Sequence, residues 1–319
     1  MATAKVFADT RKMTREEWLE ARRKGIGGSD ASAILGLNPY SSPLKVYLDK
    51  IGKSEEPETN EAMRQGTDLE AYVAERFTEE TGLKVKKCNK ILQHPEYPFM
   101  LANVDRLIVG HDWGLECKTT SPYSKFKFDE GEINPHYYWQ STHYMAVTGF
   151  EKWYVAVLVL GKAFHVFEIQ RDDAAIQMLV DREQDFWENN VLRKDPPLPT
   201  GNEADDEAIQ ALYPQGMDGI EGEDVLELDE QEDVLNLRAF KMQQRDQLDA
   251  EIKEIDQQLK LTLGDFQRGM SAGWKVNWTN TSTSRIDTKL LKEKYPQIAE
   301  EVTKTTTGRR FSVAKIKEA

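Results

Sequence analysis

The chain has 319 residues, 39% of them hydrophobic, which is enough apolar material for one large buried core and a smaller one. Its longest apolar runs fall far short of the roughly 20 residues that a membrane-spanning helix needs, so that class of protein is excluded. Two cysteines without CxxC spacing, and no apolar leader at the N-terminus, indicate neither a disulfide framework nor secretion, and we expect a cytoplasmic protein.

The net charge of −13 comes from one segment. Residues 201–234 hold thirteen acids and no Lys or Arg, whereas the rest of the chain balances at 42 acids and 42 bases. A neutral remainder can carry basic patches, so a polyanionic partner is compatible with the sequence. Pro, Gly and clustered like charge disfavour a packed core. We therefore predict a domain over 1–195, an acidic linker over 196–234 and a smaller module over 235–319.

The N-terminal region predicts two helices separated by a glycine-rich turn. Over residues 14–25, Thr14 is the expected N-cap, and Glu17 three residues later completes a capping box. After the turn "GIGG", the stretch "SDASAILG" begins a second helix, for which we expect Ser29 or Asp30 as the cap. The N–H groups of such a turn favour an anion, and an ordinary turn with a capping serine is the alternative.

A longer helix and a series of strands follow. Residues 60–82 carry apolar side chains at helical spacing, and Gly82 closes this helix. Five runs have the length and the β-branched or aromatic content of strands, at 83–94, 99–110, 113–120, 152–161 and 163–170. Residues 134–149, capped by Asn134, and residues 173–192 predict two further helices. This order predicts an α/β core with helices against a mixed sheet.

Ionisable side chains interrupt two of these apolar runs. The turn "GHDWG" joins "RLIV" to "LECK", so Asp105 heads one strand of a hairpin and Glu116 and Lys118 lie on the other. Because residues i and i+2 of a strand share a face, Glu116 and Lys118 point the same way and Cys117 points opposite. Two facing carboxylates resist burial unless a cation neutralises them, and their hard oxygens suit Mg²⁺ or Mn²⁺. An exposed, salt-bridged hairpin is the alternative that spacing alone leaves open.

Asp105, Glu116-x-Lys118 and Gln140 in the following helix resemble the PD-(D/E)xK nuclease motif. Two further blocks, "EEWLEARRKGIGGSDASAILG" and "RQGTDLEAYVAERFTEETG", are similar to blocks of the phage lambda exonuclease branch, the YqaJ-like viral recombinases, and occur in the same order. The tripeptide "NVD" stands where lambda exonuclease has Ser-Pro-Asp, which leaves the metal-binding Asp intact. The resemblance covers about residues 13–192 and implies an α/β fold with a PD-(D/E)xK nuclease core, a mixed central sheet flanked by helices.

The resemblance also implies a metal site. Asp105 and Glu116 would ligate Mg²⁺ or Mn²⁺, with the backbone carbonyl of Cys117 as a further oxygen ligand. Glu70, in the helix over 60–82, corresponds to a Glu that supports this site, and an exposed helical Glu is the alternative.

Further roles follow from the same resemblance. The catalytic set that it implies is Asp105, Glu116, Lys118 and Gln140. In that set Lys118 is the catalytic lysine, and Gln140 holds the nucleophilic water or the scissile phosphate. Arg22 and Ser29 fall where the family binds the 5′-phosphate of the strand being digested. Without the resemblance, Arg22 reads as a solvated helix residue and Ser29 as a plain cap.

The function implied is a 5′-to-3′ exonuclease that acts on double-stranded DNA ends and leaves 3′ overhangs for phage or prophage recombination by single-strand annealing. We expect it in the cytoplasm of a bacterial host, working with a RecT-type annealing protein and assembled as a homo-oligomeric ring such as a trimer. Alternatives of the same chemistry are an endonuclease or a repair nuclease. A scaffold that binds DNA ends or an annealing protein without catalysis is the alternative of another class.

The C-terminal part carries a different pattern. Leu248, Ile252, Ile255 and Leu259 alternate four and three residues apart, a short heptad pattern suited to a helical hairpin, a coiled coil or a subunit contact. The stretches that follow predict a strand, a helix and a strand, "GRRFSVAKI" being the last, and so a small α+β module.

Overall fold

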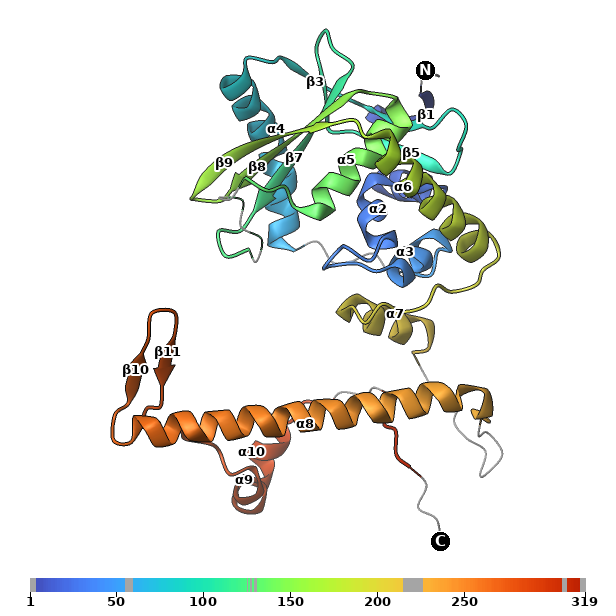
Figure 1. The fold of residues 1–319 in the computed structure, drawn as a ribbon. Helices are drawn as coiled ribbons and strands as arrows, with labels where there is room; N and C mark the ends of the chain where they lie inside the picture. Colours follow the sequence, from blue (N-terminus) through green and yellow to red (C-terminus); the bar gives the residue numbers. More distant parts are fainter. Residues whose placement is uncertain are drawn as a thin grey trace. The chain divides into compact units, whose positions relative to one another are not determined.

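The computed structural model describes residues 4–54, 60–124, 126, 128, 131–214, 226–305 and 309–315. The chain divides into two compact units, Met1–Pro214 and Gln215–Ala319, each of which is described by itself (Figure 1). Within the described residues, none of the helices combines the length and the hydropathy required to cross a membrane.

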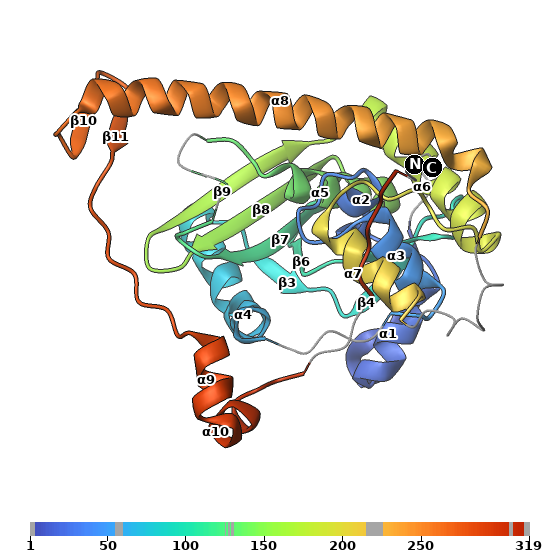
Figure 2. The ribbon, with the colours of Figure 1, turned by 90° about the horizontal axis from the view of Figure 1, so that it is seen from below.

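A mixed five-stranded sheet forms the centre of the first unit. Its strands lie in the order β3 (Val85–Lys87), β6 (Arg106–Ile108), β7 (Trp113–Thr120), β8 (Lys152–Val159) and β9 (Ala163–Gln170) (Figure 2). β7 and β8 are parallel, and the other neighbouring pairs are antiparallel. The parallel pair is joined by helix α5 (Pro135–Thr148), as a crossover between parallel strands requires.

Helices cover both faces of this sheet, which confirms the predicted fold class (Figure 1). On one face α4 (Glu61–Thr81) packs Val73 and Phe77 against Tyr154 and neighbouring strand residues. On the other face Trp153 packs against Tyr144 of α5. Successive residues of β8 thus serve opposite cores, as strand alternation dictates.

A second, four-stranded sheet runs in the order β1 (Lys5–Asp9), β4 (Lys90–Gln93), β5 (Met100–Asn103) and β2 (Ile26–Gly27). The remaining helical segments of the first unit are η1 (Thr10–Lys12), α1 (Arg15–Arg23), α2 (Gly28–Ile34), α3 (Pro43–Lys50), α6 (Asp173–Asp185), a π-helix over Phe186–Leu192, and α7 (Glu203–Leu212). The strand β1 was not predicted, because its residues are mostly exposed and show no alternation of apolar and polar side chains.

The predicted strands at 83–94 and 99–110 each form two strands that belong to different sheets. The second run breaks at Val104 and Asp105, between β5 and β6. Asp105 accepts a hydrogen bond from the backbone N–H of Cys117, so its side chain ties the break to β7. The chain therefore passes from one sheet to the other at Asp105.

The caps at three helix ends match the sequence pattern, and one does not. Thr14 and Glu17 form the capping box of α1, Asn134 caps α5, and Gly82 closes α4 with a positive φ of 73°. For α2 the prediction of Ser29 or Asp30 as cap is wrong. The N-cap is Gly27, whose N–H donates to the carboxylate of Asp30 at 2.9 Å, so Asp30 serves as the third helical residue instead.

The segment predicted as an acidic linker contains helix α7. Its Ala204 and Ala208, one turn apart, are buried, and Glu207 pairs with Lys45 of α3 at 2.9 Å between Oε2 and Nζ. The carboxylate of Asp205 accepts hydrogen bonds from the N–H and the hydroxyl of Thr200. The first unit accordingly continues to Pro214, and residues 215–225 of the acidic segment lie outside the described residues.

The second unit is built on one long helix. It contains η4 (Asp229–Gln231), α8 (Glu232–Leu263), β10 (Arg268–Met270), β11 (Lys275–Asn277), α9 (Thr288–Lys294) and α10 (Pro296–Glu301). The heptad residues lie on this single continuous helix, so no helical hairpin forms there, and all four are exposed. Residues 309–315 form no strand, whereas the rest of the last predicted strand lies outside the described residues.

Candidate active site

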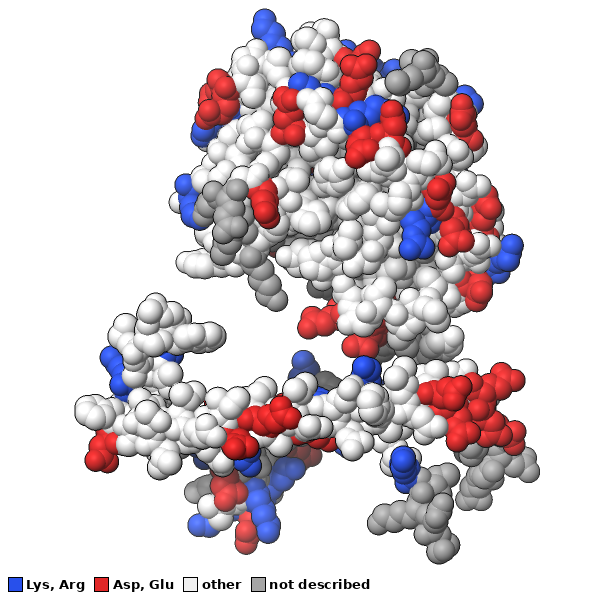
Figure 3. Space-filling model, in the orientation of Figure 1, with Lys and Arg blue, Asp and Glu red and all other residues white. Residues whose placement is uncertain are grey.

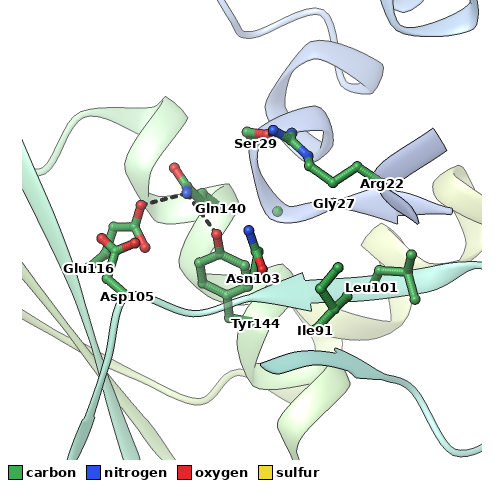
Figure 4. Close-up of a pocket in the computed structure, with 11 residues that line it drawn as sticks. Arg22, Gly27, Ser29, Ile91, Leu101, Asn103, Asp105, Glu116, Gln140 and Tyr144 are labelled. Atoms are coloured by element: carbon green, nitrogen blue, oxygen red, sulfur yellow. Dashed lines mark hydrogen bonds between the residues drawn. The ribbon is translucent and has the colours of Figure 1, made fainter. Parts of the chain in front are cut away.

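One pocket of about 180 Å³ brings together residues from both sheets of the first unit (Figure 4). It is lined by Arg22, Gly27, Gly28, Ser29, Ile91, Leu101, Asn103, Asp105, Glu116, Gln140 and Tyr144. Five of these are site residues predicted from the sequence: Arg22, Ser29, Asp105, Glu116 and Gln140. The figure shows the carboxylates at one end and the arginine and serine at the other, with Tyr144 and Asn103 between them.

Asp105 and Glu116 form the acidic end. The Asp105 carboxylate accepts a hydrogen bond from the Cys117 N–H at 2.9 Å. Burial, and next to it the negative charge of Glu116, raise the pKa of Asp105 to about 8. Both effects disfavour the ionised form, so the site as built from protein atoms alone resists carrying two negative charges.

The two oxygens of Glu116 differ sharply. Oε1 accepts from Gln140 Nε2 and contacts Lys118 Nζ, both at 2.7 Å. Oε2 is buried and has no partner among the described residues. A buried, unpartnered carboxylate oxygen next to a second carboxylate is the donor set that a hard divalent cation would complete. No three His, Cys, Asp or Glu side chains of the described chain converge on one point, so any such ion would take its further oxygens from elsewhere.

Gln140 is held in one orientation. Its Nε2 donates to Glu116 and, at 3.0 Å, to the hydroxyl of Tyr144. Since a carboxylate only accepts hydrogen bonds, the amide nitrogen must face Glu116. The amide oxygen Oε1 is then left buried, and no described residue bonds to it. Gln140 thus presents a free acceptor at the acidic end of the pocket.

Tyr144 is a pocket residue that the sequence analysis missed. It lies one turn after Gln140 on α5, and this i, i+4 spacing was the available signal. A Cβ atom on Gly28 would lie 2.5 Å from the Tyr144 ring, so the close approach of α2 to this ring requires glycine there. The pocket depends on that contact, because it joins the start of α2 to α5.

Lys118 shares the Glu116 side of β7, as predicted. Burial by itself would lower the pKa of Lys118, but attraction to Glu116 and Asp105 outweighs burial and raises it. The lysine therefore remains a cation at neutral pH. Its Nζ also lies 5.4 Å from the centre of the Tyr137 ring.

Glu70 and Cys117, both predicted for the metal site, do not line the pocket. Glu70 of α4 pairs with the buried guanidinium of Arg106, the residue after Asp105. The Cys117 thiol packs in the apolar cluster beneath α4, on the face opposite Glu116. Arg106 is a second residue that the sequence analysis missed. Only its position next to Asp105 in the sequence could have indicated that it lies near the site. The metal-binding roles of Glu70 and of the Cys117 carbonyl remain predictions.

Arg22 and Ser29 form the other end. A guanidinium nitrogen of Arg22 donates to Ser29 Oγ at 2.9 Å, and the guanidinium lies 4.8 Å from the centre of the Trp18 ring. The N–H of Gly27 is already bonded to Asp30, so it is not free for an anion as the sequence had suggested. The arginine and the serine hydroxyl are thus the groups that this end offers to a ligand.

A buried ion pair between Lys50 and Asp30 holds the backbone at Arg22 and at the Gly27 turn in place. Lys50 Nζ contacts the Asp30 carboxylate at 2.7 Å and the carbonyl of Arg22 at 3.4 Å. Burial by itself would raise the pKa of Asp30, but Lys50 and Arg22 outweigh burial and lower it. Asp30 is therefore an anion that fixes Lys50 and the Gly27 turn together. Lys50 gave no signal in the sequence, because its burial depends on tertiary packing.

The chain is similar to proteins of one family. The model of the YqaJ-like viral recombinase domain matches residues 17–151. The Bacillus subtilis (strain 168) protein YqaJ is 39% identical over 318 residues, which cover 98% of each chain. Among solved structures, the alkaline exonuclease of Laribacter hongkongensis is 22% identical, with a TM-score of 0.47 over 56% of this chain and 94% of that one. A phage-related exonuclease of Haemophilus somnus 129PT is 16% identical, with a TM-score of 0.40 over 53% of this chain and 96% of that one. By its sequence, the chain belongs to the YqaJ-like viral recombinase family.

Proposed function

We propose that the chain is a metal-dependent deoxyribonuclease that digests one strand of double-stranded DNA from its ends, in the 5′-to-3′ direction, and leaves 3′ overhangs. The observation that carries this proposal is the single pocket that has two carboxylates at one end and Arg22 with Ser29 at the other. A DNA strand that enters the pocket would place a phosphodiester against the carboxylate end and its terminal phosphate against Arg22 and Ser29. Family membership, in addition, supports a nuclease role.

The acidic end fits Mg²⁺ or Mn²⁺. Asp105 and Glu116 would hold the ion, because the Glu116 Oε2 is unpartnered and lies in the same buried pocket as the Asp105 carboxylate. Such an ion, when bound, polarises a phosphate and lowers the pKa of a bound water. Magnesium commonly uses one or two carboxylates and fills its other positions with water and substrate oxygens. A site with two carboxylates therefore suits it.

The chain's own residues then position the reaction. The free Gln140 Oε1 would accept a hydrogen bond from the attacking water and so fix its orientation. The Lys118 ammonium, held by Glu116, would stabilise negative charge that develops on the phosphate oxygens. The proton lost by the water needs an unprotonated acceptor, and a bound cation would favour the ionised forms of Asp105 and Glu116, either of which could take it.

Arg22 and Ser29 would bind the terminal 5′-phosphate. A guanidinium offers two parallel donors to a phosphate, and the Ser29 hydroxyl adds a third from the neighbouring helix. An anchored end would hold the next phosphodiester over the carboxylates, which explains why digestion would proceed from 5′ to 3′. We include in the proposal a homo-oligomeric assembly and a RecT-type annealing protein that receives the 3′ overhang.

The test uses the full-length protein with linear duplex DNA labelled at one 5′ or one 3′ end, and with the same DNA as a covalently closed circle. We expect Mg²⁺-dependent release of nucleotides that starts at the 5′ ends of the linear form, and no cut in the circle. Cleavage of the circle would favour an endonuclease. Binding of DNA ends without any hydrolysis would favour the non-catalytic scaffold.

A further inference from the structure

The β10–β11 hairpin of the second unit carries two exposed tryptophans. Its backbone ladder extends past both strands, since the Ser271 N–H donates to the Trp274 carbonyl and the Trp278 N–H to the Gln267 carbonyl, each at 2.9 Å. Trp274 and Trp278 flank β11 and lie four residues apart, and because the backbone ladder continues through both, strand alternation places the two indoles on the same face. Trp274 is 79% exposed and Trp278 is 49% exposed.

The hairpin contacts α8 at a point between the two indoles. The middle of the same face is anchored by Leu263 at the end of α8, because a Cβ atom on Gly269 would lie 3.0 Å from the Leu263 side chain. Gly269 faces Val276 across the ladder, and Val276 is half-buried. The two indoles therefore flank this contact, and most of the Trp274 side chain and about half of the Trp278 side chain remain exposed.

The surroundings of the indoles combine basic side chains and hydroxyl groups with the exposed apolar side chains of Phe266 and Met270. Between Phe266 and Ile286 the sequence contains three bases and no acid: Arg268, Lys275 and Arg285. None of the three forms an ion pair with a described residue. After Trp278 the exposed run "TNTSTS" adds hydroxyl and amide groups. In Figure 3 blue and white atoms cover the hairpin, whereas the densest red patch of this unit covers the start of α8.

We propose that this hairpin binds single-stranded DNA. Trp274 and Trp278 would stack on bases, and Arg268, Lys275 and Arg285 would contact phosphates. Stacking on an exposed aromatic ring tolerates any base, and cations beside the rings attract the backbone. Phe266 and Met270 are exposed as well, as in a protein-docking patch, but three cations without an acid between Phe266 and Ile286 favour a polyanion over a protein partner. This inference goes beyond the proposed nuclease and does not depend on it.

The test measures binding by the full-length protein with the metal chelated, so that no strand is digested. The probe is a fluorescent oligo(dT) with a 5′-hydroxyl, which offers no base pairs and no terminal phosphate for Arg22. We expect Trp274→Ala to weaken binding by about 5- to 100-fold, the range for removal of one stacked base, and Trp274→Phe to retain most of the affinity. Phe240→Ala removes from α8 an aromatic that is 53% exposed, close to Trp278, and should change the affinity less than about 2-fold.

A second pair of variants tests the binding of phosphates by the basic side chains. Arg268→Gln with Lys275→Gln should reduce the slope of log affinity against log salt by roughly 0.7 for each phosphate that the protein no longer neutralises. Equal oligo(dT) affinity of the wild type and Trp274→Ala would overturn the proposal, as would a wild type that does not bind the probe. If Trp274→Ala keeps the wild-type affinity for oligo(dT) but sediments as a smaller species than the wild type, the rings belong to a subunit contact instead. All of these outcomes are independent of whether the protein hydrolyses DNA.

Discussion

At one end of the pocket Asp105 and Glu116 bring two carboxylates to a single lysine, and Glu116 Oε2 has no partner among the described residues. At the other end Arg22 bonds to a neutral hydroxyl, while Asp30 and Lys50 neutralise each other beneath it. The first end holds two carboxylates and one ammonium, and it avoids excess negative charge because the pKa of Asp105 is raised to about 8, whereas the second end has surplus positive charge. A divalent cation would make the first end positive, and both ends would then attract phosphate. The acidic end therefore requires a bound cation before it can attract phosphate, whereas the basic end can bind phosphate without one.

The largest effect should follow from breaking the acidic end. We expect Asp105→Ala or Glu116→Ala to reduce DNA digestion by more than about 1,000-fold, because each removes one of the two carboxylates that would hold the ion. Lys118→Ala should reduce digestion to a similar extent and still bind Mn²⁺, since the lysine is not a ligand. Digestion rates together with Mn²⁺ titration by calorimetry check this. Wild-type activity of Glu116→Ala would refute the assignment of the acidic end.

The ion pair beneath the basic end should matter for stability. Asp30→Asn leaves Lys50 buried with only two longer contacts, to Asp49 and to the Arg22 carbonyl, and we expect a loss of about 3 to 5 kcal/mol in the free energy of unfolding at pH 7. The pKa of Asp30 is lowered in the folded state, so its contribution is full above the ordinary value near 3.9 and is lost as pH falls through the lower folded value. The difference between variant and wild type should therefore shrink at pH 3.

Urea unfolding at both pH values measures this difference. Asp68→Asn, which removes an exposed pair with Arg64, is the matched control and should cost less than about 1 kcal/mol. A loss of the same size at pH 7 and pH 3 would show that the Asp30 charge is not the cause.

The basic end itself should set the preference for a terminal phosphate. We expect Arg22→Ala to slow digestion of 5′-phosphorylated ends by about 10- to 100-fold, the loss for a charge-assisted contact of about 1.5 to 3 kcal/mol. The wild type should lose similar activity on 5′-hydroxyl ends, and the variant should not discriminate between the two. Release of nucleotides from blunt duplexes that differ only in this phosphate provides the measurement. Equal wild-type rates on both duplexes would make the contact between Arg22 and Ser29 purely structural.

The two ends also differ in how far the sequence reveals them. Glu116 and Lys118 share a face because strands alternate, and the hairpin that carries them follows from a turn signal and two apolar runs. No local pattern brings Arg22 and Ser29 to the same pocket, because their approach to Gln140 depends on packing between segments over 100 residues apart. Family resemblance suggested these two residues, and residue spacing alone did not.

Parts of the fold escaped prediction for a similar physical reason. Asn103, Asp105 and Arg106 interrupt the apolar run 99–110, but such an interruption is equally typical of a site residue at the start of a strand, so it did not reveal that the chain changes sheets at Asp105. The Asp105 side chain is held at the break by a hydrogen bond from the Cys117 N–H, which only the folded hairpin provides. Helix caps such as Thr14 and Asn134 were predictable, because their partners lie within three residues.

The smallest effect should come from Tyr144, which lies between the two ends. Its hydroxyl accepts one of the two hydrogen bonds from Gln140 Nε2, and the bond to Glu116 remains when it is removed. Tyr144→Phe keeps the ring against Gly28, so the joint between α2 and α5 should survive. We expect a loss of about 3- to 10-fold in kcat, the value of one neutral hydrogen bond, with unchanged Mn²⁺ affinity and unchanged preference for 5′-phosphate. Tyr72→Phe, on the exposed side of α4, is the control and should leave kcat unaltered. A loss of 5′-phosphate preference in Tyr144→Phe would mean that Tyr144 binds the DNA end directly instead of orienting Gln140.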